Sequence, residues 1–230
     1  TPLQAGLRYL PLTLVSFFAA PVSGALLSRV PARVMMSASL AVAGVGLLLM
    51  SGVDAGSEWT TLLGGFLVLG AGVGFLNPVI ADVALSVVPK ERSGMAAGIN
   101  DTFRQVGVAV GVAVWGAIFV GRGAAKVTEL TAGTATATGD HPRQLVEAAS
   151  SGNLQQALAT LAPQAQPAVS HAAHEGFLTG LNEVLTLGGL VCFVGAALAL
   201  WLVREHEIER EPLEGAGEPE PETVPQAAAA

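Results

Sequence analysis

Four polar side chains interrupt an otherwise apolar segment, residues 93–121: Asn100, Asp101, Arg104 and Gln105. Amides, a carboxylate and a guanidinium can bind a polar ligand, pair with one another or take part in proton transfer. If this segment crosses a membrane, ionisable groups are costly there and indicate a functional site by default. Asp101 and Arg104 are three residues apart, the spacing at which two side chains meet on a helix.

A second carboxylate, Asp82, follows 23 uncharged residues and precedes the mostly apolar run 83–88. Arg104 lies eleven residues into its segment, roughly 16 Å from the nearer end at 1.5 Å per residue. That depth is close to the middle of a bilayer, so the guanidinium requires a counter-charge from Asp101 or Asp82. Two interpretations stay open: a structural ion pair that holds two helices together, or a direct role in handling substrate or protons.

Five apolar stretches of membrane-spanning length must hold these groups in place. Between the charged residues at 8 and 29, 33 and 54, 58 and 82, and 183 and 204, the chain carries no Asp, Glu, Lys or Arg. About 20 apolar residues form a helix that crosses ~30 Å of hydrocarbon. The sequence therefore predicts an all-α membrane protein with helices over residues 5–28, 34–52, 59–88, 93–121 and 175–203.

The composition excludes most soluble classes of protein. The chain is 51% hydrophobic and 13% charged and contains 28 glycines, too apolar for an ordinary soluble domain. Of the net charge of −7, residues 204–230 contribute eight Glu against two Arg. No basic patch is available for nucleic acid, so we expect no nucleic-acid partner.

The charged residues between the spans predict an orientation. Arg29 and Arg33 occupy the first short connection and Lys90 and Arg92 the third, whereas the second carries acids only. Because positive charge accumulates on the cytoplasmic side, this bias places the start of the chain outside and its end inside a plasma membrane. We accordingly expect four spans within residues 1–121, an extracytoplasmic loop over 122–174, a last span over 175–203 and a disordered cytoplasmic tail over 204–230.

Pairs of glycines four residues apart recur in two of the spans. Such pairs let neighbouring helices approach closely in a membrane. On the 93–121 helix Gly107 and Gly111 lie along the polar side with Asn100 and Arg104, while Met95, Ile99 and Phe103 project to the opposite side as an expected lipid-facing stripe. The predicted helix-packing residues are Gly70, Gly74, Gly94, Gly98, Gly107 and Gly111.

The sequence favours neither a metal site nor an enzyme. His171 and His174 are three residues apart but have no further ligand candidate beside them, so we expect no metal. Cys192 lies within a span and has no partner cysteine in the chain. No paired catalytic constellation lies within the spans, and we expect neither enzymatic activity nor a cofactor.

The run from Val88 to Gly107 resembles the penultimate-helix pattern of the fourteen-span drug:proton antiporters, a branch of the major facilitator superfamily. That pattern is Pro-x-x-Arg-x-Gly-x-Ala-Ser-Gly followed by Asn-x-x-Arg-Gln-x-Gly-x-x-x-Gly. This chain meets it at Pro89, Arg92, Gly94, Ala96, Gly98, Asn100, Arg104, Gln105, Gly107 and Gly111, and departs from it with Ala97 in place of Ser.

A second resemblance lies in the first connection. Gly24, Arg29 and Arg33 match the superfamily's cytoplasmic loop pattern, Gly-x-Leu-Ala-Asp-Arg-x-Gly-x-Arg. Ser28 stands where the pattern has Asp, and Pro31 where it has the second Gly. The opening Thr-Pro-Leu-Gln-Ala-Gly also resembles the family's entry into its tenth span.

The resemblance implies that the chain holds spans ten to fourteen of a transporter whose nine upstream spans are missing. Such a protein would export hydrophobic, often cationic, small molecules by alternating access, driven by a proton gradient and without a cofactor. Its partners would be the lipid bilayer, the substrate and the missing N-terminal half. The substrate and proton pathway would involve Asp82, Asn100, Asp101, Arg104 and Gln105. The alternative is a non-transporting membrane scaffold in which Arg104 serves a structural ion pair.

Overall fold

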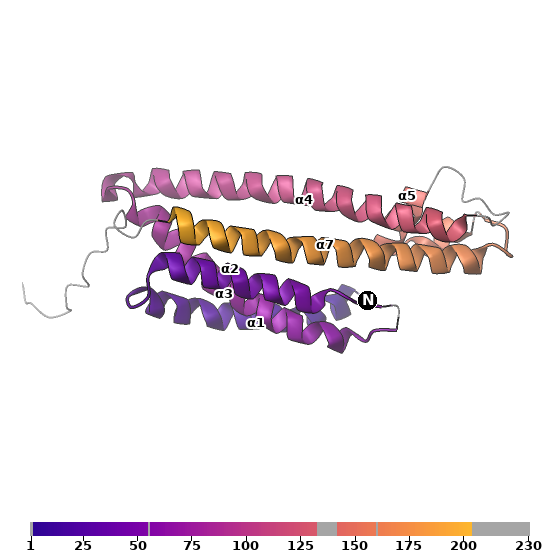
Figure 1. The fold of residues 1–230 in the computed structure, drawn as a ribbon, viewed down its shortest axis with the longest axis horizontal. Helices are drawn as coiled ribbons and strands as arrows, with labels where there is room; N and C mark the ends of the chain where they lie inside the picture. Colours follow the sequence, from indigo (N-terminus) through magenta and orange to yellow (C-terminus); the bar gives the residue numbers. More distant parts are fainter. Residues whose placement is uncertain (1, 55, 133–141, 160, 204–230) are drawn as a thin grey trace, which may run out of the picture.

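The computed structural model describes residues 2–54, 56–132, 142–159 and 161–203, and these residues form helices and connections without a strand. The predicted all-α class is confirmed (Figure 1). The elements in chain order are α1 (Pro2–Leu27), α2 (Ala32–Met50), η1 (Trp59–Leu62), α3 (Leu63–Ser86), η2 (Lys90–Arg92), α4 (Ser93–Thr131), α5 (Pro142–Ser150), α6 (Leu154–Leu158) and α7 (Gln166–Leu202).

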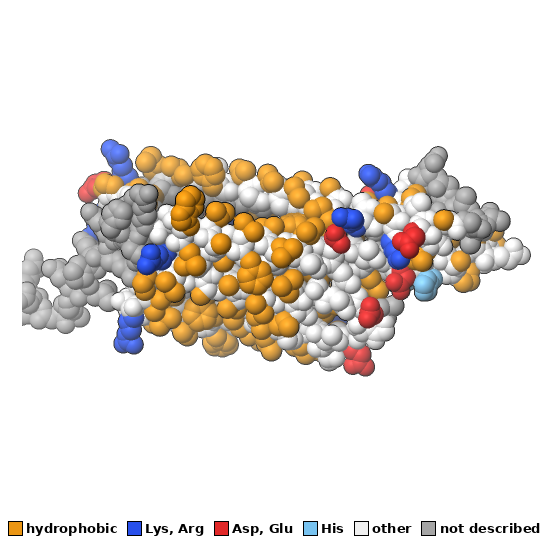
Figure 2. Space-filling view, viewed as in Figure 1, with side chains coloured by type: hydrophobic (Ala, Val, Ile, Leu, Met, Phe, Trp, Pro, Cys, Tyr) orange, Lys and Arg blue, Asp and Glu red, His pale blue; other side chains and the backbone are white. Residues whose placement is uncertain are grey.

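Five of these helices, α1, α2, α3, α4 and α7, are long and apolar enough to cross a membrane. Many of their large side chains lie on the outside, among them Phe17 (71% exposed), Phe103 (74%) and Trp201 (81%). In Figure 2, hydrophobic side chains cover much of the surface between two ends that carry the charges. This surface is suited to lipid rather than to water, as the sequence predicts.

The helix ends follow local backbone chemistry. α2 begins directly after Pro31 and ends at Met50, where Gly52 takes a positive φ of 84° that turns the chain. α3 ends at Ser86, three residues before Pro89, which cannot continue a helix. α7 begins with a proline in its first turn, where the missing N–H would have no helical acceptor.

Close backbone contacts at glycines hold α1, α2 and α3 together. A Cβ on Gly70 would lie 2.5 Å from the carbonyl oxygen of Leu12, and one on Gly74 would lie 2.5 Å from that of Ser16. Both glycines thus lie directly against the backbone of α1. Gly72, which the sequence analysis did not select, is equally tight: a Cβ there would lie 2.5 Å from the backbone nitrogen of Ala43 in α2.

Side-chain hydrogen bonds to the backbone connect the same helices. Ser23 in α1 donates to the carbonyl of Phe75 in α3 at 2.8 Å, and Ser37 in α2 donates to the carbonyl of Ala196 in α7. Asn182 in α7 makes three bonds to the end of α2: its Oδ1 accepts from the N–H groups of Gly52 and Val53 at 3.1 Å, and its Nδ2 donates to the Val53 carbonyl at 3.0 Å. The bonds of Ser37 and Asn182 tie α7 to α2 near both of its ends.

The segment 122–174 differs from the predicted loop in its bounds and in its structure. α4 continues to Thr131 and α7 begins at Gln166, which makes these helices about 58 and 56 Å long. Figure 1 shows both running past the ends of α1–α3, with α5 beside them. The helices persist because apolar side chains bury one another here: Val127, Leu145, Val146, Leu154, Leu158, Val169, Ala172 and Ala173 form one core.

α5, α6 and the adjoining ends of α4 and α7 lie together at one end of the molecule. The side of the membrane on which they lie stays a prediction from the loop charges. The predicted tail, 204–230, lies outside the described residues.

The glycine contacts lead to a stability prediction. We expect Gly72→Ala to lower the stability of the protein in detergent, because the new methyl group would overlap the backbone of Ala43. Overpacking of this kind costs about 1–3 kcal/mol. Gly64→Ala on the same helix is the matched control, since a Cβ there meets no atom within 4 Å. Thermal unfolding of both variants checks the prediction, and equal midpoints would contradict it.

Candidate functional site

A groove of about 790 Å³ separates α3 from the first half of α4. Three of the five predicted pathway residues, Asn100, Asp101 and Arg104, line it. Gln105 is exposed on α4 but is not part of the lining. The complete lining is Asn77, Ile80, Ala81, Ala84, Leu85, Ala97, Gly98, Asn100, Asp101 and Arg104.

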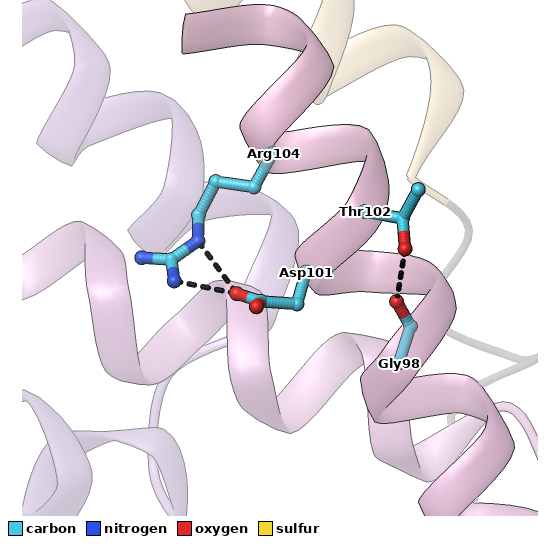
Figure 3. Close-up of polar contacts among 4 residues, drawn as sticks. All are labelled: Gly98, Asp101, Thr102 and Arg104. Carbon is cyan, nitrogen blue, oxygen red and sulfur yellow. Dashed lines mark hydrogen bonds and ion pairs between the residues drawn. The ribbon is translucent and has the colours of Figure 1, made fainter.

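Arg104 and Asp101 form an ion pair within α4. Nη2 of Arg104 lies 2.5 Å from Oδ1 of Asp101, and Nε donates to the same oxygen at 3.2 Å. In Figure 3 the two side chains extend to the same side of α4, whereas Thr102 lies on the other side and donates to the Gly98 carbonyl at 2.8 Å. Both charged side chains remain more than half exposed, at 59% and 57%.

This arrangement decides which carboxylate balances Arg104. Between the two candidates from the sequence, the structure selects Asp101, and no ion pair joins Arg104 to Asp82 among the described residues. Both Arg104 donors bind Oδ1, so the second oxygen of Asp101 takes no part in the pair. The site therefore combines a neutralised charge with further polar atoms that can bind a ligand.

Asp82 lies on a different side of α3 from the groove lining. Its Oδ2 is buried and accepts no hydrogen bond from the described residues. The next residue, Val83, packs at the edge of a core made by Ala32, Met35 and Val79. This oxygen therefore lacks the hydrogen bond that a buried polar atom normally makes.

Asn77 is a groove residue that the sequence analysis missed. It reaches the groove from α3, and its Nδ2 donates to the Val73 carbonyl one turn earlier at 3.0 Å, which leaves Oδ1 for other contacts. The available signal was an amide inside a charge-free span, directly before Pro78. An amide carries no charge, so Asn77 does not stand out in the pattern of ionisable residues.

The first half of α4 is uncovered on both sides. Met95, Ile99 and Phe103 are exposed as the predicted lipid-facing stripe requires. The opposite side is open as well: a Cβ on Gly94, Gly98 or Gly107 would meet no atom within 4 Å, and one on Gly111 would meet only Trp115 of the same helix. Within the described residues these four glycines therefore have no packing partner, unlike Gly70 and Gly74.

The loop residues Gly24, Arg29 and Arg33 lie at or near the turn between α1 and α2. This turn is closed by the N–H groups of Arg29 and Val30, which both donate to the Leu26 carbonyl. Both arginine side chains are exposed. Ser28, in the place of the pattern's Asp, carries no charge, and its hydroxyl donates to the Ala25 carbonyl at 3.1 Å.

Comparison with known proteins places the chain in a family. Residues 1–137, more than half of its length, match the sequence pattern of the Major Facilitator Superfamily. The chain belongs to this superfamily. The relatives that the chain matches within this superfamily include drug-efflux transporters, so the resemblance to drug-efflux members is confirmed.

Individual relatives within the superfamily carry names that refer to resistance and export. The tetracenomycin C resistance and export protein of Streptomyces glaucescens is 28% identical over 215 residues, which are 93% of this chain and 40% of that protein. The multidrug resistance protein Stp of Mycobacterium tuberculosis is 36% identical over 118 residues, 51% of this chain and 22% of that protein. A probable actinorhodin transporter of Streptomyces coelicolor is 33% identical over 126 residues, 53% and 22% respectively.

The chain thus spans two fifths or less of the length of these relatives. That it corresponds to spans ten to fourteen stays a prediction.

The ion pair generates a second prediction. Asp101→Asn leaves Arg104 without its counter-charge at membrane depth, where an unpaired charge is costly. We expect this variant to reach a severalfold lower level in the membrane, and Asp101→Asn with Arg104→Gln together to restore the level. Quantitative immunoblotting of membranes checks both. If Asp101→Asn accumulates like the unmodified protein, the pair does not stabilise α4.

Proposed function

We propose that this chain is part of a proton-coupled secondary transporter that exports hydrophobic or cationic small molecules by alternating access. One observation carries the proposal: the groove brings Asn77 of α3 together with Asn100 and the Asp101–Arg104 pair on one side of α4, whose other side is apolar and exposed. Polar groups at this depth are retained at a cost, which a transport pathway explains. The names of the relatives point in the same direction.

The groove has the chemistry for an amphipathic cation. Ile80, Leu85 and three alanines give it apolar walls, and the two asparagines supply hydrogen-bonding amides. The Asp101 oxygen that Arg104 leaves unused offers a negative pole for a cationic group. Apolar walls with a few convergent polar groups are the usual composition of a small-molecule site.

Asp82 is our first choice for the proton carrier and Asp101 our second. The buried Oδ2 of Asp82 accepts no hydrogen bond from the described residues, so this carboxylate oxygen is available to a proton. Asp101 is paired with Arg104 through Oδ1, and its other oxygen is open to a cationic ligand or a proton. Asn100, Arg104 and Gln105 would contact the substrate or the proton path. No cofactor is required, because the proton gradient supplies the free energy.

The open polar side of α4 indicates where the remaining spans of the transporter belong. Alternating access needs two halves that rock about a site near the bilayer midplane. We propose that the missing N-terminal half faces the glycine side of α4 and completes the groove. In the plasma membrane, the start of this chain would lie outside and its end inside, as the loop charges predict.

The alternative is a membrane scaffold in which Arg104 only ties helices together. The geometry argues against it, because Arg104 pairs within its own helix. A pair between residues of one helix cannot hold that helix against another. A scaffold role also does not explain the groove or the amide that Asn77 contributes to it.

Transport by the whole protein tests the proposal. We expect Asp82→Asn to abolish gradient-driven efflux of a hydrophobic cation such as tetraphenylphosphonium while the protein reaches its normal level in the membrane. Asn keeps the shape of the side chain but cannot release a proton. Asp54→Asn is the matched control, because Asp54 is an exposed acid in the connection after α2.

Efflux and membrane abundance are measured together, with and without a proton gradient. Normal efflux by Asp82→Asn would eliminate Asp82 as the proton carrier and leave Asp101 or a residue of the missing half as the candidate. A loss of protein together with efflux would assign Asp82 a structural role. Equal efflux by the unmodified protein with and without a proton gradient would contradict proton coupling itself.

A further inference from the structure

A second groove, of about 340 Å³, lies on the outer surface where α1, α2 and α3 meet, away from the α3–α4 groove. Leu26 and Val30 line its end near the α1–α2 turn, Val34, Ala38 and Val42 follow along α2, and Phe75 closes it from α3. From Val34 to Val42 the groove runs about 12 Å along the helix axis, most of the ~15 Å depth of one leaflet's hydrocarbon.

The walls of this groove offer nothing to a polar ligand. Ser39 is the one polar side chain in the lining, and its hydroxyl already donates to the Met35 carbonyl at 2.7 Å within α2. Leu26, Val34 and Val42 remain 37–41% exposed and thus open the groove to the surrounding lipid. A groove of this length and composition fits a flexible apolar chain of about leaflet length.

Two exposed arginines adjoin, in the sequence, the residues that line the groove at its end near the α1–α2 turn. Arg29 directly precedes Val30 and Arg33 directly precedes Val34, and both guanidinium-bearing side chains are exposed. Figure 2 shows basic side chains at the end of the molecule that carries the α1–α2 turn, bordering the hydrophobic surface. Guanidinium groups bind phosphate oxygens strongly and repel cations.

We propose that this groove is a binding site for an anionic phospholipid, with one acyl chain along Val34–Val42 and its phosphate held by Arg29 and Arg33. The combination selects this occupant over the alternatives. A cationic drug would be repelled at the mouth, a free anion would gain nothing from the apolar walls, and a zwitterionic lipid would lose part of the charge attraction. Under the predicted orientation, the lipid belongs to the cytoplasmic leaflet, where anionic headgroups are concentrated.

Native mass spectrometry of the whole transporter tests the proposal. The purified protein is titrated with phosphatidylglycerol or phosphatidylcholine of identical acyl chains, and the retained lipid is counted. We expect phosphatidylglycerol to bind more tightly, and each of Arg29→Gln and Arg33→Gln to reduce this preference about fivefold. Arg92→Gln is the matched control, an exposed arginine at the same end of the molecule that does not border the groove.

A second variant tests the chain-binding part separately. Ala38→Phe fills the groove and should lower the retention of both lipids while leaving Arg29 and Arg33 in place. If the glutamine variants fold poorly, Arg29→Lys with Arg33→Lys keeps the charge and should preserve the preference for phosphatidylglycerol.

Several results would overturn the proposal. An unchanged phosphatidylglycerol preference in both glutamine variants would remove the arginines from the site, and full retention in Ala38→Phe would remove the groove. Displacement of the lipid by excess glycerol 3-phosphate would indicate a simple anion site. Displacement by tetraphenylphosphonium would make the groove a drug site. None of these outcomes depends on whether the transporter couples to protons, so the proposal can fail independently of the proposed function.

Discussion

The cost of an unpaired polar group in hydrocarbon is the constraint on which the rest of this structure depends. With no water to bind, the backbone satisfies its own hydrogen bonds by forming helices. The helices then associate through close backbone contact at Gly70, Gly72 and Gly74, because lipid removes the hydrophobic drive between them. The few polar side chains inside the bundle bind backbone carbonyls, as Ser23 and Ser37 do. In the α3–α4 groove, by contrast, amide and charged side chains gather.

The described helices differ in how closely their neighbours pack against them. α1, α2 and α3 form a packed unit, and α7 is fixed to α2 by Ser37 near one end and by Asn182 at the other. The first half of α4 stands apart, open on its polar and its apolar sides. A helix that carries a charged pair yet has few neighbours of its own is positioned to serve an interface with other spans.

The sequence predicts the spans well because charged residues mark their ends and are nearly absent between them. It predicts less where tertiary packing decides. Val127 and Val146 look in sequence like ordinary residues of a polar segment. In the structure they are buried with Val169 in the core beside which α4 and α7 run past the ends of α1–α3. The choice of Asp101 over Asp82 as the partner of Arg104 depends on which side of α3 faces the groove, and Asn77 gains its importance from the same orientation. The rotation of α3 about its own axis is set by packing, and the sequence pattern alone does not specify it.

Substrate protection of single cysteines tests the central claim, that the polar side of α4 is the transport pathway, most directly. In a Cys192→Ser background, Asn100→Cys places a thiol in the groove, and Phe103→Cys places one on the apolar side, where the side chain is 74% exposed. Maleimide reacts with thiols that water can reach. The account predicts that the thiol at position 100 is labelled, that a transported cation protects it, and that the thiol at position 103 is labelled poorly with or without the cation. Labelling of position 103 with protection there, and none at position 100, would contradict it.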